Sequence, residues 1–541
     1  MKKLTVSAIV LFLVSTLLLA SCGGGTTTTT ATTTATTTAT TTATVTTTAP
    51  TQVEPSGTLR FAITSYGNET LDPPLSGATS INQILLVYDF LVGTTPDGKD
   101  VSAETGLANK WETSADGLTW TFHLRKGVLF DKGLGEVTAE DVKFSLERNI
   151  AEGSRLPLAK GMRQAIASID VVDQYTVKIN LTAPYMFLAF NLSAMTDATG
   201  TVVPKKYVER VGDEEFALEP VGSGPYRLTR WEPGSYFQFE ARADYWNGVP
   251  KYKDLYLYKI TEEATRIAML KTGELDVAPV TIPSIEGMEA AGFKVFTKTD
   301  RNNIIGGIAR QWEGVLASPK VRLALNLAIN REELLSTLLM GLGRYNDDGN
   351  YDSAALGIRT LPNIGYDPTR ARQLLEEAGY AGEEITLSPN PQDPIPLVTQ
   401  ALAGYFEAIG VNVNLLPMDV AAKIAGFKDP SRINSISILG AAQRGVNGMA
   451  AGRAMFYSDG RWDLCRDPEL DALIDKAEAA LNLDEFAKAQ GDFYEKVYSD
   501  NRLIYVVTTG EFFATSPELK IAGWTFAVGY NVGLVNLTMG R

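Results

Sequence analysis

Strand-like and helix-like segments alternate from Gly57 onward, and this alternation limits the chain to α/β architectures. Strand-like segments such as Thr119–Leu124 place polar and apolar residues alternately, as half-buried strands do. Helix-like segments begin at a capping residue followed by proline, as at Asp367-Pro368, and end at a glycine such as Gly379. With 541 residues, of which 45% are hydrophobic, the chain is long enough for about three to four domain-sized units with sizeable cores.

The same patterns place individual elements. We expect strands at 58–63, 119–124 and 175–181, and a hairpin that joins 227–231 to 236–241. Helix starts are expected at residues whose side chains can accept a hydrogen bond from a free backbone N–H group: Thr138, Thr261, Ser318, Asn330, Asp367 and Asp467. The helix that follows Thr261 is expected to end at Gly273, and a strand is expected to follow it.

The first 54 residues differ from the rest of the chain. Two lysines precede an apolar run from residue 4 to residue 20, the pattern of a secretory signal peptide. The ending Leu19-Ala20-Ser21-Cys22 resembles a bacterial lipobox, which implies that residues 1–21 are removed and Cys22 becomes a lipid-modified N-terminus. An uncleaved transmembrane anchor is the alternative. Residues 26–48 include 18 threonines among 23 residues, so we expect 22–54 to be a disordered tether.

Charged and metal-ligating residues exclude several functions. Lys and Arg total 49 against 63 Asp and Glu, and the resulting net charge of −14 argues against nucleic acid as a partner. His123 is the single histidine, and Cys22 and Cys465 are the two cysteines. Neither a zinc site with several His or Cys ligands nor a disulfide framework can form from one such chain. We expect His123 and Cys465 to be packed structural residues.

Sequence motifs of common enzymes are missing. The chain has no Gly-x-Ser-x-Gly turn, no P-loop, no Gly-x-Gly-x-x-Gly fingerprint and no His-Glu-x-x-His pair. Adjacent carboxylates such as Glu262 and Glu263 are expected to be solvated charges, while a glycosidase-like pair assembled by the fold stays open as an alternative. We therefore expect a protein that is not an enzyme and needs neither cofactor nor metal.

Six ordered segments resemble the extracytoplasmic solute-binding proteins of bacterial ABC importers, in the oligopeptide, dipeptide and nickel group known as family 5. The resemblance spans about residues 57–520, and its segments are 107–148, 220–226, 244–246, 269–276, 321–331 and 366–380. It implies a two-lobed periplasmic-binding-protein type II fold with an additional domain and a ligand cleft between the lobes. By this likeness lobe I comprises 55–93, 200–298 and 504–541, the additional domain 94–199, and lobe II 299–503.

The resemblance also implies a function without chemistry. A peptide or similar small solute is captured by closure of the lobes and delivered to an ABC permease, whose ATPase subunits drive import. The protein is then expected to be a monomer outside the cytoplasm, in the periplasm or on the outer cell surface, held to the membrane by lipid on Cys22. The alternatives are a surface-anchored hydrolase that acts on a glycoside or peptide, and a sensor on the same fold.

The class of ligand stays open because one family feature is absent. Many peptide binders of the family pair a carboxylate in a Trp-x-x-Asp segment with the peptide α-amino group, whereas the corresponding residues 438–448 contain no acid. A peptide, a saccharide and a metal chelate are all candidates. We expect ligand contacts from aromatic side chains with a polar edge and from arginines, which suit a wet cleft: Tyr66, Arg310, Trp312, Arg444 and Tyr457.

Overall fold

The computed structural model describes residues 54–77, 80–96, 98, 100–345, 356–390, 394–418, 426, 429, 432–442, 447–460, 462–519, 534 and 538. Residues Gln52–Arg541 form one compact unit. The predicted signal peptide, Cys22 and the threonine-rich tether up to residue 53 lie outside the described residues.

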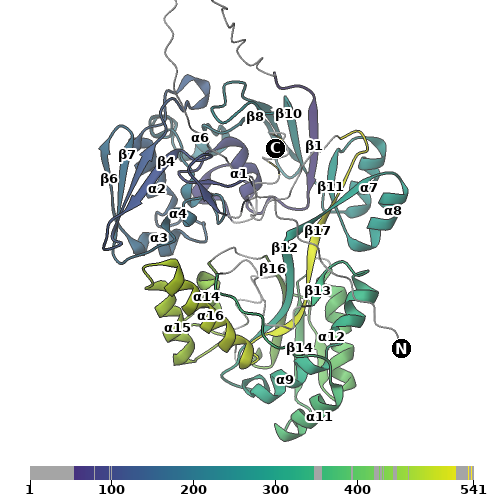
Figure 1. The fold of residues 1–541 in the computed structure, drawn as a ribbon. Coiled ribbons are helices and arrows are strands. Elements are labelled where there is room, and N and C mark those ends of the chain that lie inside the picture. The colour runs from purple at the N-terminus through teal and green to yellow at the C-terminus, as the bar shows by residue number, and fades with distance from the viewer. Residues whose placement is uncertain are drawn as a thin grey trace, which may run out of the picture. The chain divides into compact units, whose positions relative to one another are not determined.

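Eleven strands of the described part of the chain form one mixed sheet (Figure 1). Ten of them follow the order β15-β14-β16-β12-β17-β11-β1-β10-β9-β8, and β13 pairs with β17 beside this path. Their bounds are β1 Thr58–Ile63, β8 Tyr226–Glu232, β9 Tyr236–Ala241, β10 Asp254–Lys259, β11 Val277–Val280, β12 Lys294–Ala309, β13 Arg344–Tyr345, β14 Glu384–Pro389, β15 Asn412–Leu415, β16 Ser435–Ala442 and β17 Ile504–Thr515. The first expected strand and the expected hairpin, formed by β8 and β9, are confirmed.

Two long strands, β12 and β17, connect the two halves of this sheet (Figure 1). Residues 294–298 of β12 pair with 511–515 of β17 beside β11, whereas 303–307 pair with 504–509 beside β16. The register shifts between Lys298 and Asn303, where the strands pass from one half to the other. We call the half with β1 and β8–β11 lobe I and the half with β14–β16 lobe II.

One sheet runs continuously through both lobes. β17 pairs with β11 of lobe I near its end and with β12 along both halves, while β12 pairs with β16 of lobe II. The same two strands therefore hydrogen-bond to both lobes, which merges their sheets into one.

A second, antiparallel sheet stands apart from the large one. It has the order β4-β5-β7-β6, with bounds β4 Ala108–Thr113, β5 Thr119–Leu124, β6 Ile166–Asp173 and β7 Thr176–Leu181. Its buried side chains, among them Phe122, Val177 and Ile179, form a cluster of their own with helix α2 (Ala139–Asn149). This sheet falls inside the segment 94–199 expected to form an additional domain, whose boundaries stay predictions. The short strands β2 Gly93–Thr94 and β3 Val101–Ser102 pair beside it in sequence.

The remaining helices flank these sheets. Their bounds are α1 Ile81–Val87, α3 Ala159–Ala165, α4 Leu188–Asn191, α5 Lys205–Val211, α6 Asp213–Leu218, α7 Glu263–Thr272, α8 Ile285–Ala290, α9 Pro319–Ala328, α10 Arg331–Glu333, α11 Pro368–Glu377, α12 Ile395–Ala408, α14 Met449–Phe456, α15 Pro468–Glu478 and α16 Leu483–Ser499. Helices α9, α11 and α12 pack their apolar faces against the lobe II strands in one core, for example through Leu325, Leu374 and Leu402.

Side-chain caps form at four of the six expected helix starts, whereas Ser318 precedes α9 without a cap hydrogen bond. Thr138 and Asp141 form a capping box at the start of α2, and the side chains of Asp367 and Asp467 accept bonds from backbone N–H groups of α11 and α15. The expected cap at Thr261 is wrong by one residue. Helix α7 begins after Glu262, and the carbonyl oxygens of Ile260 and Thr261 accept hydrogen bonds from the guanidinium of Arg266 in the same helix.

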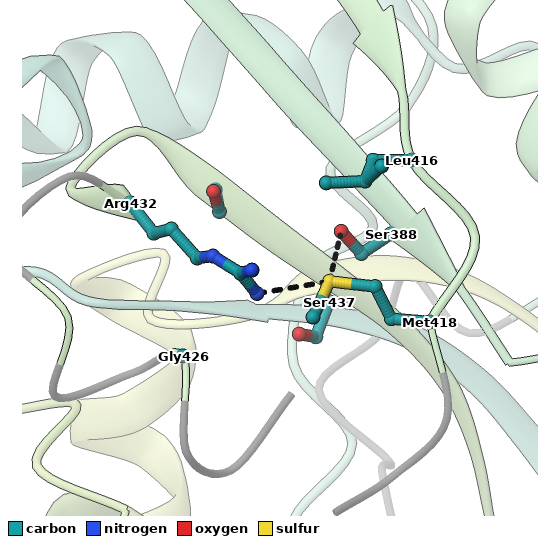
Figure 2. Close-up of a pocket in the computed structure, with 7 residues that line it drawn as sticks. Ser388, Leu416, Met418, Gly426, Arg432 and Ser437 are labelled. Atoms are coloured by element: carbon teal, nitrogen blue, oxygen red, sulfur yellow. Dashed lines mark hydrogen bonds between the residues drawn. The ribbon is translucent and has the colours of Figure 1, made fainter. Parts of the chain in front are cut away.

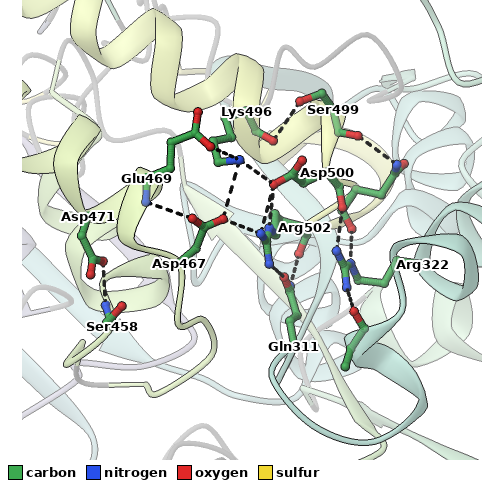
Figure 3. A network of polar contacts seen from close by, with 12 residues as sticks. Gln311, Arg322, Ser458, Asp467, Glu469, Asp471, Lys496, Ser499, Asp500 and Arg502 are labelled. Carbon is green, nitrogen blue, oxygen red and sulfur yellow. Dashed lines mark hydrogen bonds and ion pairs between the residues drawn. The ribbon is translucent and has the colours of Figure 1, made fainter.

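A network of charged side chains connects α15 and α16 to the residues just before β17 (Figure 3). The Arg502 guanidinium, just before β17, donates to Asp467 at 2.6 Å and to Asp500 at 3.0 Å. Lys496 of α16 lies 2.9 Å from Glu469 of α15. Because the partners come from the start of α15, from the end of α16 and from the residues before β17, the network holds the two helices against the strand.

The two rare residue types have ordinary surroundings. Cys465 is fully buried in the apolar cluster under α14–α16, and this burial raises the pKa of its thiol. His123 lies in β5, with Nε2 3.5 Å from a carboxylate oxygen of Glu112 on the neighbouring strand. Burial of Cys465 confirms that it is a packed residue.

Candidate ligand-binding site

The carboxyl ends of parallel strands in lobe II lie toward the crossing strands. β14 and β16 run parallel, with Pro389 beside Ile438 as their last pair. β16 continues to Ala442, which pairs with Asn303 where β12 enters lobe II. Ligands of open α/β sheets bind at the carboxyl ends of strands. This edge is therefore the candidate site in lobe II.

A shallow hollow, open to solvent, lies over β14 and β16 (Figure 2). Its described lining residues come from β14, from the segment after β15, from the segment before β16 and from β16 itself: Ser388, Leu416, Met418, Gly426, Arg432, Ser435 and Ser437. The hollow thus joins segments that lie far apart in the sequence.

Strand periodicity places three hydroxyl groups on the floor of this pocket. Ser435 and Ser437 alternate along β16 with Ile436 and Ile438, which are fully buried in the lobe II core. Ser388 of β14 is the register partner of Ser437. Successive side chains of a strand point to opposite faces. The isoleucines therefore complete the core while the serines face the hollow.

Tyr66, one of the expected contact residues, lies in the core of lobe I. Its side chain is 1% exposed, and its hydroxyl donates to the carbonyl oxygens of Leu257 at 2.6 Å and Ser235 at 3.1 Å. Burial raises the pKa of this hydroxyl well above its usual value. In this arrangement Tyr66 connects the segment after β1 to strand β10 and to the turn before β9.

Arg310 and Trp312 lie together beyond the end of β12. The last residue of β12, Ala309, pairs with Ile436 near the start of β16, so both side chains follow the end of the strand that lies away from the crossing segment. The guanidinium carbon of Arg310 is 5.3 Å from the centre of the Trp312 ring. A second guanidinium, that of Arg466, lies 3.5 Å from the same ring.

Arg310 is also connected to the pocket. Its buried guanidinium forms an ion pair with Glu313 and donates to the carbonyl oxygen of Asp429 at 2.5 Å. The backbone N–H of Arg432, a lining residue, donates to that same carbonyl oxygen at 3.1 Å. Arg310 therefore holds the segment that carries Arg432.

Of the other expected contact residues, Tyr457 lies among the described residues and Arg444 does not. Tyr457 follows α14; its ring lies 3.9 Å from the guanidinium of Arg453, and its hydroxyl donates to Asp475 at 3.1 Å. Arg444 and Cys22 lie outside the described residues. The structure thus brings Arg310 and Trp312 together and places Tyr66 in the other lobe, and the role of each in ligand contact stays a prediction.

An aromatic contact connects the segment before α4 with the helices of lobe II. Phe187 and Phe486, at the start of α16, meet edge to face with ring centres 4.4 Å apart, and both are at most 5% exposed. Phe190 and Met195 belong to the same buried cluster. This contact joins the segment 94–199, expected to form the additional domain, to the helices of lobe II, separately from β12 and β17.

Sequence reasoning missed both the pocket and this contact. The alternation Ser435-Ile436-Ser437-Ile438 was the available signal for the pocket floor, because it marks a strand with one apolar and one hydroxyl face. No sequence pattern predicts the contact between Phe187 and Phe486. Each is one apolar residue among apolar neighbours, and the two lie far apart in the sequence.

Two further properties of the described residues bear on function. None of their helices is long and apolar enough to span a membrane. No group of three or more His, Cys, Asp or Glu side chains in this part of the chain is arranged to hold a metal ion.

Known proteins resemble this chain in sequence and in fold. Residues 102–446 match the model of the bacterial extracellular solute-binding proteins, family 5. The glutathione-binding protein GsiB of Salmonella choleraesuis is 32% identical over 370 residues, which cover 66% of this chain and 69% of the relative.

Solved structures share the fold at lower identity. NikA from Brucella suis, solved with Fe(III)-EDTA, has a TM-score of 0.78 at 21% identity and covers 88% of this chain and 99% of its own. The oligopeptide-binding protein AppA from Bacillus subtilis, solved with a nonapeptide, has a TM-score of 0.72 at 20% identity and covers 90% and 99%. Both confirm the two-lobed periplasmic-binding-protein type II fold expected from the sequence. With the family model and the GsiB relative together, this chain belongs to the family 5 bacterial extracellular solute-binding proteins, and its role is to bind a substrate.

Proposed function

We propose that this protein captures a peptide or a similar small solute by closing its two lobes and delivers it to an ABC permease. The observation that carries the proposal is a pair of connections to lobe II. The strands β12 and β17 cross once between the lobes, and the Phe187–Phe486 contact joins the segment expected to form the additional domain to lobe II. A protein built this way can open at the strands when the aromatic contact separates, and a solute bound between the lobes favours the closed form in proportion to its extra affinity for it.

The proposal includes the residues and segments that the sequence analysis singled out. Arg310, Trp312, Arg444, Tyr457 and Tyr66 are proposed to contribute to the site by contact or by positioning its segments. Closure is proposed to occur along the lobe boundaries at 299 and 504, while 94 and 200 delimit the proposed additional domain within lobe I. We propose further that the protein acts as a monomer and catalyses no reaction; the family and its relatives are binding proteins.

Denaturing the purified unit Gln52–Arg541 is expected to release a small solute that mass spectrometry identifies. The same solute, added back at 100 times its dissociation constant, should raise the free energy of unfolding of the unit by about 2.7 kcal/mol. The solute should be recovered chemically unchanged after the incubation. Conversion of the solute into products would support the hydrolase alternative instead. Absence of any solute, together with no thermal shift from peptides, saccharides or metal chelates, would contradict the proposal.

Replacing Cys22 by serine is expected to release the protein from the membrane fraction of the cells that export it. The variant has no thiol at the position where the proposed diacylglyceryl group is attached. Fractionation and mass spectrometry of the mature N-terminus measure the result. Cys465→Ser is the matched control, since that thiol is buried in the folded unit, and it should stay with the membrane. A Cys22→Ser variant that stays membrane-bound would favour an uncleaved anchor.

A further inference from the structure

We propose that Met195 is a peroxide-sensitive switch of lobe closure. Opening of the lobes exposes its thioether to oxidation, and the sulfoxide that forms opposes the closed form and lowers solute capture. The inference rests on the proposed function and adds a means of regulation to it. It begins from one short segment whose side chains pack into two separate apolar clusters.

The residues around α4 are shared between these two clusters. Leu188 and Leu192 are buried in the cluster of the antiparallel sheet. Phe187, Phe190 and Met195 are instead buried in the apolar cluster under α14–α16. The segment is thus anchored in one cluster while three of its side chains reach the other.

Met195 depends on lobe II for its burial. Its side chain is 7% exposed. Apart from Phe187 and Phe190, every buried member of its cluster among the described residues lies at Ile308 or beyond, in lobe II or at the start of β17. When the lobes separate, Met195 stays with its own segment and loses these partners, so solvent reaches its sulfur.

Met162 of α3 offers an internal comparison. It is shielded to a similar degree, at 2% exposed, but it belongs to the cluster of the antiparallel sheet, whose described buried members all lie between Leu91 and Val202. Opening at β12 and β17 moves that cluster as one piece, so the thioether of Met162 stays covered. The two methionines therefore differ chiefly in whether the other lobe covers them.

Oxidation changes what the contact can bury. Hydrogen peroxide transfers one oxygen atom to the thioether sulfur: the O–O bond breaks, an S–O bond forms, the sulfur loses two electrons, and the peroxide is reduced to water. The sulfoxide is polar, and burying a polar group without a hydrogen-bond donor is unfavourable. The described cluster around Met195 consists mainly of Phe, Met, Leu, Ile and Ala side chains, which donate no hydrogen bond. The sulfoxide is therefore more stable in the open form, where water surrounds it.

The first test treats the purified protein with hydrogen peroxide and assigns each sulfoxide by peptide mass spectrometry. Met195 should be oxidised at least tenfold faster than Met162, and Met340, which is 49% exposed, sets the fast limit. Once the peroxide has been removed, retention of a defined mixture of tripeptides, disaccharides and metal chelates should be at least fivefold lower than before treatment. A methionine sulfoxide reductase should restore it. Prior loading with the retained solute should slow oxidation of Met195 and leave that of Met340 unchanged.

Substitutions separate the thioether from its packing. Met195→Leu keeps nearly the same volume and has no sulfur, so it should retain solute as wild type does and keep that retention after peroxide. Met195→Gln places a polar amide in the same cluster and should lower retention without peroxide. Met162→Leu is the matched control and should stay peroxide-sensitive. Thermal unfolding of each variant without solute distinguishes loss of binding from loss of folding.

Two results would overturn the switch while leaving solute capture intact. One is oxidation of Met195 as slow as that of Met162, because opening would then not expose it. The other is loss of retention by peroxide-treated Met195→Leu, because another residue would then be responsible. Retention of nothing by untreated wild type would overturn the proposed function together with the switch, so the two failures are distinguishable.

Discussion

Replacing Asp89 by alanine is expected to lower the free energy of unfolding by about 3–5 kcal/mol. The carboxylate of Asp89 is buried and accepts three hydrogen bonds, from the hydroxyl of Ser223 at 2.8 Å, the hydroxyl of Tyr245 at 2.8 Å and the indole N–H of Trp246 at 2.9 Å. Burial raises the pKa of this carboxyl, and the three donors oppose that shift. Alanine leaves all three donors without their acceptor in a site closed to most water.

Urea unfolding of the unit Gln52–Arg541 measures the effect. Glu152→Ala removes a carboxylate that is exposed, so it is the matched control and should change the free energy by no more than about 0.5 kcal/mol. A loss below about 1 kcal/mol for Asp89→Ala would show that solvent replaces the missing acceptor.

Replacing Phe187 by alanine is expected to weaken solute binding about 10- to 100-fold without changing the ligand pocket. The Phe187 ring is buried against Phe486 of lobe II, and full burial of such a side chain is worth about 1.5–3 kcal/mol. Opening of the lobes exposes both rings, so the variant loses this energy only in the closed form. The apparent affinity of a solute that needs the closed form falls with the population of that form.

Small-angle scattering without solute and calorimetric titration with the solute released from wild type measure the two consequences. The radius of gyration should increase for Phe187→Ala, and the affinity should fall. Phe130→Ala is the matched control, because Phe130 is buried inside the cluster of the antiparallel sheet, away from lobe II. It should lower thermal stability and leave affinity unchanged. An unchanged radius and affinity for Phe187→Ala would show that the contact does not control opening.

The local elements of this fold were predictable from the sequence. Alternating residues at 58–63 and 119–124 gave strands, and Asp367 and Asp467 gave helix starts, because strand periodicity and N-terminal caps depend on residues a few positions apart. The family was also readable, since its segments occur in order along the chain. The expected start at Thr261 was one residue early, and helix ends are the part of a local pattern that is least sharply defined.

The site was less predictable for a physical reason. Arg310 and Trp312 have the residue types that bind ligands. They nevertheless lie away from the crossing segment, because β12 runs from that segment toward its end at Ala309 and both residues follow this end. Ser388 and Arg432 line one pocket because β14 lies beside β16, and Phe187 reaches Phe486 because the segment before α4 packs against the helices of lobe II. The sequence thus determined the elements, the α/β class and the family. The tertiary structure decided which side chains share a pocket, because neighbouring strands and packed lobes bring together residues that no local pattern relates.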